Sequence, residues 1–156
     1  MVSPLIVQGD IVDQPVDAIV NAWNRNIIPW WLLWPQGVSA AIKRRAGYAP
    51  FRELGRMGPI ALGHAVQTGP GRLPCKAIIH VAGINMWWRA SAKSIQSSVV
   101  SAMRLVQRHG HASVAFPVIG AGTGGFGEQG ALQLMLRAFE PIASDAHVRV
   151  VLYRPS

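Results

Sequence analysis

Cysteine is almost absent from this sequence, and long hydrophobic runs are missing. Its 156 residues include one cysteine, Cys75, which excludes an intramolecular disulfide and a zinc site built from several thiolates. The longest apolar run, residues 27–35, contains two prolines and is far shorter than the roughly 20 residues of a membrane-spanning helix. The first nine residues lack the basic and apolar regions of a secretion signal. We therefore expect a cytoplasmic protein that does not span a membrane.

Acidic residues are also scarce. Seven aspartates and glutamates stand against 15 lysines and arginines, so the formal net charge is +8. A chain this basic attracts polyanions, which include diphosphate ligands and nucleic acids, although a solvated basic surface has the same composition. The scarcity leaves few carboxylates for acid–base catalysis, and no spacing of histidine and acidic residues indicates a metal site.

Apolar segments typical of strands alternate with amphipathic segments typical of helices. The alternation favours an α/β fold in which helices cover both faces of one sheet. The chain has no internal repeat, low-complexity tract or linker-like stretch, so we expect a single domain over residues 1–156. We predict strands at residues 4–8, 18–20, 63–68, 77–81, 114–119 and 148–153, and helices at residues 38–46, 94–107 and 129–139.

A glycine-rich segment follows the fifth predicted strand. Four of the six residues from position 120 to position 125 are glycine, and a strand, glycine turn and helix in succession let backbone N–H groups hold phosphate. The segment matches the glycine pattern of dinucleotide-binding folds. It lies late in the chain, however, which argues against an NAD-dependent dehydrogenase, and no Gly-Lys-Ser/Thr follows, so it is not a P-loop. A plain tight turn is the alternative interpretation.

Polar side chains also follow the first two predicted strands. Asp10 comes directly after the first strand, and Asn21 and Asn24 follow the second. Open α/β sheets bind ligands at the carboxyl ends of their strands, so these side chains are candidates for ligand contacts. Each one taken alone is equally typical of a turn or a helix cap.

Together, and in this order, these segments resemble the macro domain, the ADP-ribose-binding module. Residues 9–11 (GDI) and 16–24 (VDAIVNAWN) are similar to that family's GDI turn and VDAIVNAAN strand. Residues 37–42 (GVSAAI), 62–83 and 115–127 are similar to its GGVDGAI, GEAVIT…LP…IIHTVGP and AFPAIGTGVYGFP stretches. The resemblance covers most of the chain. It implies a three-layer α/β/α macro-type fold with a central mixed sheet, and ADP-ribose as the ligand, with no cofactor and no metal.

The resemblance also implies a role for each candidate ligand residue. Asp10 would accept a hydrogen bond from the adenine amino group beside the Ile11 amide, because an ionised carboxylate only accepts. Tyr153 would stack on adenine, Asn24 would reach the distal ribose, and Asn21 would brace the loops. Contacts to the diphosphate would come from a helix N-terminus and from the glycine-rich segment, whose last residue would cover the distal ribose. These contacts involve Gly37, Val38 and Ser39, and then Ile119, Gly120, Ala121, Gly122, Thr123, Gly124, Gly125 and Phe126.

Two departures from the family bear on catalysis and on partners. Ser39 stands where hydrolytic members often carry an aspartate, and a hydroxyl of ordinary pKa cannot serve as a carboxylate base. The family's glycine-rich first loop is replaced by residues 26–36, which include Trp30, Trp31 and Trp34. Three interpretations fit these tryptophans: a lid over the ligand, a contact for a partner protein, or part of the domain's own core.

Two residues are the candidates for catalysis. Asn24 would orient a water molecule while the substrate's own diphosphate helps to activate it. Glu128 lies two residues after Phe126, near the expected place of the distal ribose, and would position or activate water. Its alternative role is to stabilise the start of a helix. His64 and His80 are alternative bases, although a histidine in a strand is more often a core residue.

We therefore expect a protein that binds ADP-ribose and hydrolyses it from ADP-ribosylated protein or nucleic acid, or that deacetylates O-acetyl-ADP-ribose. A non-catalytic reader of mono- or poly(ADP-ribose) is the first alternative, and Ser39 favours it. A nucleic-acid-binding protein that uses the net charge of +8 and the aromatic residues is the second. The sequence contains no recognised nucleic-acid motif in support of that second alternative.

Overall fold

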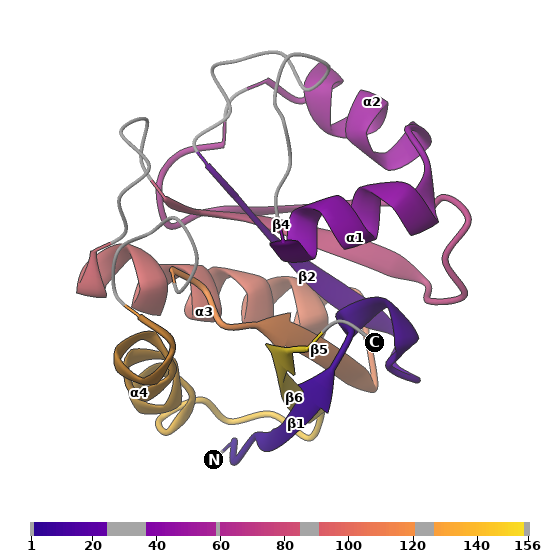
Figure 1. The fold of residues 1–156 in the computed structure, drawn as a ribbon. Helices are drawn as coiled ribbons and strands as arrows, with labels where there is room; N and C mark the ends of the chain where they lie inside the picture. The colour runs from indigo at the N-terminus through magenta and orange to yellow at the C-terminus, as the bar shows by residue number, and fades with distance from the viewer. Residues whose placement is uncertain (1, 25–36, 59, 85–90, 121–126, 155–156) are drawn as a thin grey trace.

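The computed structural model describes residues 2–24, 37–58, 60–84, 91–120 and 127–154. Figure 1 shows how the helices and strands of these residues are arranged. In chain order they are β1 (Leu5–Gly9), the short 3-10 helix η1 (Ile11–Asp13), β2 (Ala18–Asn24), α1 (Gly37–Ala46), α2 (Ala49–Arg56), β3 (Ala65–Thr68), β4 (Ala77–Ile84), α3 (Ala92–Arg108), β5 (Ser113–Pro117), α4 (Glu128–Phe139) and β6 (His147–Tyr153).

The strands form one mixed sheet. Its six strands lie in the order β1-β6-β5-β2-β4-β3. Neighbouring strands are parallel except at one end, where β3 runs antiparallel to β4. Consequently β1, β2, β4, β5 and β6 all point the same way, and their carboxyl ends lie along one edge of the sheet. The expected central mixed sheet is confirmed.

Helices cover both faces of this sheet. On one face α1 and α2 pack with η1 around a cluster that includes Ile42 and Phe51. On the other face α3 and α4 pack around a cluster that includes Val99, and Phe116 of β5 meets Phe139 of α4 edge to face, with ring centroids 5.0 Å apart. Figure 1 shows the two pairs of helices on opposite sides of the sheet. The expected three-layer α/β/α arrangement is confirmed.

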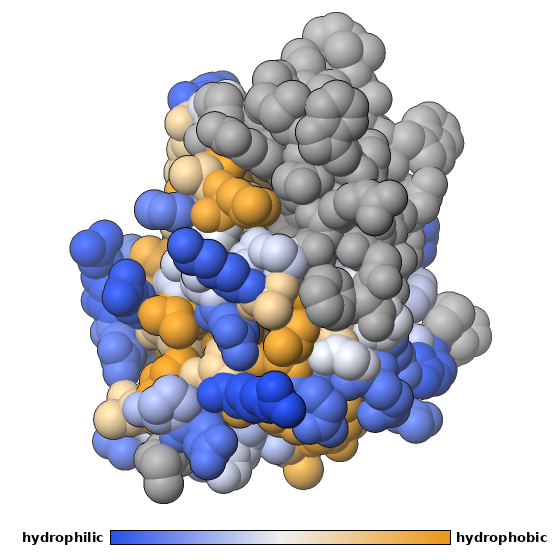
Figure 2. Space-filling model, turned by 90° about the vertical axis from the view of Figure 1, so that its left-hand side faces the viewer, coloured by the Kyte–Doolittle hydropathy of each residue, from blue (hydrophilic) through white to orange (hydrophobic). Residues whose placement is uncertain are grey.

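The outer sides of the helices are mainly polar. In α4 Gln129, Gln133 and Arg137 are exposed at a spacing of four residues, whereas Met135 and Phe139 are buried, as expected of an amphipathic helix. Figure 2 shows the side of the molecule where α4 lies, and hydrophilic side chains cover much of it with smaller hydrophobic groups between them. Within the part of the chain that the structure describes, no helix is long and apolar enough to cross a membrane.

The helix α2 was not predicted from the sequence. It has a proline in its first turn and buries Pro50, Phe51 and Leu54 against the sheet. Eight residues make only two helical turns, so the apolar spacing is too short to distinguish a helix from an irregular segment. Packing against the sheet supplies the stability that a helix this short lacks by itself.

Four strand boundaries also differ from the prediction by two or more residues. The strands β2 and β4 extend to Asn24 and Ile84 instead of residues 20 and 81. The strand β3 begins at residue 65 instead of 63, because Gly63 adopts φ +80° in a turn and the His64 N–H donates to the carbonyl of Ala61 at 2.9 Å. His64 is therefore an exposed turn residue and not a strand residue. The strand β5 ends at Pro117 instead of residue 119, because proline has no N–H to continue the ladder.

Candidate functional site

The predicted ligand residues come from segments that meet at the carboxyl edge of the sheet. The strands that end there finish at Gly9, Asn24, Ile84, Pro117 and Tyr153. Asp10 directly follows the first of these ends, Asn24 and Tyr153 are themselves strand ends, and Gly120 lies three residues beyond β5. Such an edge is where open α/β sheets bind ligands. Residues that are far apart in the sequence can thus contact one ligand molecule.

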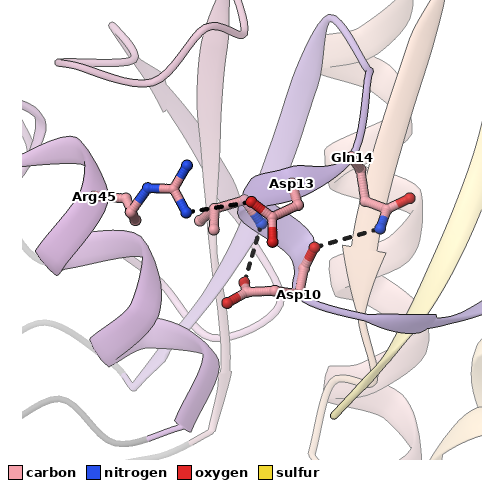
Figure 3. A network of polar contacts seen from close by, with 5 residues as sticks. Asp10, Asp13, Gln14 and Arg45 are labelled. Carbon is pink, nitrogen blue, oxygen red and sulfur yellow. Dashed lines mark hydrogen bonds and ion pairs between the residues drawn. The ribbon is translucent and has the colours of Figure 1, made fainter. Parts of the chain in front are cut away.

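The turn that holds Asp10 is fixed by its own hydrogen bonds. The Asp10 Oδ1 atom accepts from the Val12 N–H at 3.2 Å, and the Asp10 carbonyl accepts from the Gln14 side chain at 3.3 Å. Arg45 of α1 forms an ion pair with Asp13 at 3.2 Å, so α1 holds the same turn from the other side (Figure 3). Among the described residues no group donates to Asp10 Oδ2. This oxygen can accept a hydrogen bond from a ligand.

Ile11 can offer a ligand only its backbone. Its side chain is 1% exposed and belongs to the core between α1, α2 and the sheet. The hydrogen bonds of the turn use the N–H groups of Val12, Asp13 and Gln14, and none of them uses the N–H of Ile11. This geometry fits the expectation that the Ile11 amide lies beside a ligand ring.

Arg154 is a charged residue at this edge that sequence reasoning missed. Tyr153 pairs with Gly9 at the ends of β6 and β1, and the Arg154 N–H continues the ladder by donating to the Gly9 carbonyl at 3.0 Å. The Arg154 guanidinium then donates to both oxygens of Glu128, at 2.9 and 3.1 Å. Nothing in the sequence distinguishes Arg154 from the other basic residues, because its partner is 26 positions away.

Glu128, one of the two candidates for catalysis, is held by the ion pair with Arg154. Its carboxylate lies beside the end of β6, because Arg154 directly follows Tyr153, the last residue of that strand. The hydrogen bond from Arg154 is the main cause that lowers the pKa of Glu128. A carboxylate of lowered pKa is a weaker base. Glu128 is the first residue of α4, and the ion pair with Arg154 sets the direction of its side chain. This geometry favours a structural role for Glu128.

Asn21 lies inside the sheet and takes part in a buried chain of hydrogen bonds. Its side-chain amide lies 3.1 Å from His80 Nδ1, and His80 Nε2 lies 2.9 Å from the Thr68 hydroxyl. Thr68 donates its proton to the Gly69 carbonyl at 3.0 Å, so it accepts from His80 Nε2–H, and the unprotonated Nδ1 accepts from Asn21. All three side chains are buried. The chain needs a neutral imidazole at His80.

Burial agrees with that protonation state. Desolvation lowers the pKa of His80 from 6.5 to about 3, since a charged imidazole loses its hydration in the core. His80 is thus a hydrogen-bonded core histidine, as the alternative interpretation of this residue expected. That Asn21 binds the ligand stays a prediction. Its amide Nδ2 donates to His80 within the sheet.

A turn begins directly after β5, at Ile119 and Gly120. Ile119 is buried, and its N–H donates to the sulfur of Met135 at 3.3 Å. Gly120 has φ +88°, a conformation that a side chain would strain. Gly127, also at positive φ, precedes α4. Gly120 and Gly127 have the positive φ that a glycine-rich turn uses. Residues 121–126, where the rest of the turn is predicted, lie outside the described residues.

The first turn of α1 contains the predicted residues of the helix N-terminus. Gly37 is the first residue of α1, and Val38 and Ser39 follow in the same turn. Four N–H groups at the start of a helix lack partners within it and can bind an anion. The side chains of Val38, Ser39 and Asn24 lie outside the described part of the structure. Trp30, Trp31 and Trp34 also lie outside the described residues.

The described residues include no group of three or more histidine, cysteine or acidic side chains that could hold a metal ion. Cys75 is half-buried, and burial raises the pKa of its thiol. A thiol with a raised pKa is a poor nucleophile. Among the described residues at the edge, the groups available to a ligand include the Asp10 carboxylate, the Tyr153 ring, the Arg154 guanidinium and backbone N–H groups.

Comparison with known proteins supports the sequence resemblance. The sequence profile of the family described as Macro domain matches residues 20–135. A macro domain-containing protein of Caldanaerobacter subterraneus subsp. tengcongensis is 32% identical over 155 residues, which cover 95% of this chain and 85% of that protein. The O-acetyl-ADP-ribose deacetylase of Escherichia coli K12 is 35% identical over 140 residues, which cover 85% of this chain and 75% of the relative.

Solved structures share the fold. A macrodomain variant of Oceanobacillus iheyensis with ADPR has a TM-score of 0.83 to this chain at 27% identity, and the match covers 94% of this chain and 83% of that one. The macrodomain of the same organism with ADP has a TM-score of 0.84 at 26% identity, covering 96% and 82%. The similarity thus extends over nearly the whole chain in both sequence and structure.

Proposed function

Because this chain belongs to the Macro domain family, we propose that it binds ADP-ribose at the carboxyl edge of its sheet and hydrolyses ADP-ribosyl substrates. The substrate is an ADP-ribosylated protein or nucleic acid, or O-acetyl-ADP-ribose. The observation that carries the proposal is the convergence of the segments around Asp10, Asn24, Gly120 and Tyr153 on one edge. The deacetylase name of the Escherichia coli relative and the ADPR in the Oceanobacillus iheyensis structure support it.

The adenine ring is placed at the η1 turn. Asp10 Oδ2 accepts from the exocyclic amine, which an ionised carboxylate suits because it only accepts, and the Ile11 N–H lies beside the ring. Tyr153, half-buried at the end of β6, stacks on the ring. The support for this assignment is the fixed geometry of the turn, which leaves one carboxylate oxygen and one backbone N–H for a ligand.

The diphosphate is placed between the start of α1 and the turn after β5. The helix contributes the N–H groups of Gly37, Val38 and Ser39, where the helix dipole supplies about half a positive charge. The turn contributes backbone contacts from Gly120 to Phe126. Ile119 forms the buried base of the turn, since its N–H is held by Met135. Asn21 supports the adjoining strand end from within the sheet.

Hydrolysis is assigned to a water molecule oriented by Asn24 at the end of β2. The water attacks the acetyl carbonyl carbon, or the distal-ribose carbon that bears the linked group, and the leaving oxygen or nitrogen takes up the proton. The substrate's own diphosphate helps to activate this water, since Ser39 offers no carboxylate base.

Glu128 is assigned a positioning role through Arg154. The carboxylate holds the guanidinium in a two-pronged ion pair at the corner of Tyr153 and Gly9, and this arrangement is geometrically specific. Glu128 therefore acts on the site through the end of β6. If Glu128→Gln changes kcat and leaves KM for the substrate unchanged, this assignment is wrong and Glu128 acts on the water.

A non-catalytic reader of mono- or poly(ADP-ribose) is the second candidate function. Two observations favour it. Ser39 replaces the aspartate of hydrolytic relatives, and the ion pair with Arg154 occupies the one carboxylate that follows the glycine-rich segment closely. A reader needs the same ADP-ribose contacts without the water chemistry.

The binding half of the proposal is tested by calorimetric titration with ADP-ribose. We expect micromolar affinity for the native protein and a loss of about tenfold or more for Asp10→Asn, since a hydrogen bond to a charged group contributes about 1.5–3 kcal/mol. The asparagine keeps an oxygen to cap Val12. The matched control is Asp13→Asn, which removes an equal charge from the same turn. Equal affinities for the two variants would refute the adenine assignment.

The catalytic half is tested by release of ADP-ribose from glutamate-, arginine- and nucleobase-linked substrates, and of acetate from O-acetyl-ADP-ribose. We expect release from at least one of them, and its loss in Asn24→Ala with ADP-ribose affinity retained within a few fold. A protein that binds ADP-ribose and releases nothing from any of the four is a reader.

Three broader proposals accompany this function. The chain forms one domain over residues 1–156, as the continuous sheet from β1 to β6 supports. It works in the cytoplasm, in keeping with its single cysteine. The tryptophans 30, 31 and 34 contact a partner protein, a proposal supported by the departure of their loop from the family's glycine-rich pattern.

A further inference from the structure

A group of basic side chains lies on α1, α2 and the loop after β3, and none of them except Arg45, which holds the Asp10 turn through Asp13, is used by the proposed ADP-ribose site. We call it the α1–α2 basic surface. Six of the chain's 15 lysines and arginines belong to it; five are exposed, and Lys43 is half-buried. Its members are Lys43, Arg44, Arg45, Arg52, Arg56 and Arg72.

The elements that carry these groups lie next to one another. The helices α1 and α2 lie next to each other on one face of the sheet (Figure 1). Arg72 joins the end of α1, because its N–H donates to the Ala46 carbonyl at 3.0 Å and its guanidinium lies over Gly47. Arg52 and Arg56 are one helical turn apart on α2 and so share a side of it. The two helices and the loop that carry the basic groups are thus neighbours, with Arg72 at the end of α1.

Acidic side chains offset little of this charge. Asp13 pairs with Arg45 at 3.2 Å, and Glu53 accepts from the Gly69 N–H at 3.0 Å. All seven carboxylate side chains of the protein belong to the described residues. In this part of the chain none of them forms an ion pair with Arg44, Arg52, Arg56 or Arg72. The surface therefore carries a net positive potential that attracts anions.

An exposed aromatic ring lies within the same surface. Tyr48, between α1 and α2, is 57% exposed, and the Lys43 ammonium lies 5.5 Å from the centre of its ring. A cation beside an exposed aromatic face suits an unpaired nucleotide. Its base can stack on the ring while its phosphate pairs with the cation. Duplex DNA hides its base faces, so it would use the arginines and leave Tyr48 without a stacking partner.

We propose that the α1–α2 basic surface binds single-stranded nucleic acid. Arg44, Arg52, Arg56 and Arg72 pair with successive phosphates, and a base stacks on Tyr48. The proposal is independent of the ADP-ribose assignment, because it uses none of the residues placed at the carboxyl edge.

The test is fluorescence anisotropy of a labelled 20-nucleotide oligothymidylate with the full chain at several salt concentrations. Four phosphate contacts predict a slope of about −3 for log affinity against log salt. We expect Arg52→Glu/Arg56→Glu to weaken binding at least tenfold. The matched control is Arg104→Glu/Arg137→Glu, which changes the net charge equally at exposed positions of α3 and α4 on the other face, and it should weaken binding less than threefold.

Stacking is tested separately. Tyr48→Ala should weaken binding about tenfold, because stacking of one base contributes on this scale, and Tyr48→Phe should restore it. Circular dichroism checks that each variant is folded, and Arg44→Gln/Arg72→Gln replaces the first double variant if that one is not. Three results would each overturn the proposal. The first is an equal loss of affinity in the surface and control variants, and the second is absence of binding at 50 mM salt. The third is an affinity for heparin equal to that for the oligonucleotide, together with no effect of Tyr48→Ala.

Discussion

The free energy of unfolding of this protein is expected to fall between pH 7 and pH 5. Replacing His80 by glutamine is expected to make that fall much smaller. In the folded protein the imidazole is neutral, accepts from Asn21 and donates to Thr68 in a fully buried position. Protonation at Nδ1 would break the bond from Asn21 and place an unsolvated charge in the core. The unfolded chain has no such restriction, so it binds the proton first.

The magnitude follows from the two pKa values. Burial lowers the pKa of His80 from 6.5 to about 3 in the folded state. Between these values the unfolded state binds more protons, so the contribution to stability is complete above pH 6.5 and declines as the pH falls towards 3. At pH 5 the difference of about 1.5 units corresponds to about 2 kcal/mol. That is a large fraction of the 5–15 kcal/mol typical of a folded domain.

The assay is urea unfolding at pH 7, 6 and 5, followed by circular dichroism. The free energy of unfolding of the native protein should fall by about 2 kcal/mol more from pH 7 to pH 5 than that of His80→Gln. Titration of all other groups cancels in this difference. His64→Gln removes one imidazole from an exposed turn and serves as the control. If His80→Gln and the native protein lose equal stability over this range, the reasoning about the buried histidine is refuted.

Three further predictions test the packing of the fold. Glu128→Gln should lower the free energy of unfolding in urea by less than about 1 kcal/mol, because its ion pair with Arg154 is exposed; a larger loss would contradict this. Gly71→Ala should lower the melting temperature more than Gly58→Ala. Both have positive φ, but an added Cβ clashes with the Ala46 carbonyl oxygen only at Gly71. Phe139→Ala, which removes the ring packed edge to face with Phe116, should destabilise the core by about 3–5 kcal/mol in urea.

Local pattern was sufficient to predict most of the fold. The apolar spacing of residues 94–107 predicted α3, because a helix of this length repeats its buried side several times. The glycines after β5 predicted a turn, and Gly120 and Gly127 do adopt positive φ. The sequence does not predict the short helix α2, because two turns give too little pattern. It predicts His64 in a strand because residues 63–68 are strand-like, and the turn at Gly63 leaves no sign in that pattern.

The candidate site divides in the same way. The residues of the site could be named in advance because the order of motifs along the chain resembles one family, and the carboxyl edge was predictable from the alternation of strands and helices. The hydrogen-bond partners of Glu128 and Asn21 were not predictable. Glu128 is separated from Arg154 by 26 positions, and Asn21 from His80 by 59, so neither contact leaves a local signal.

By itself the sequence determined the family, the alternation of elements and the places where backbone must turn. These properties depend on side-chain spacing and on the conformational range of single residues, which act over a few neighbours. Only the tertiary structure decided which carboxylate is held by Arg154 and which asparagine is held by His80. It also decided that α1, α2 and the distant loop with Arg72, which carry six cations, lie next to one another. Such contacts arise when separate elements pack on one sheet, and that packing brings together residues which the chain order keeps apart.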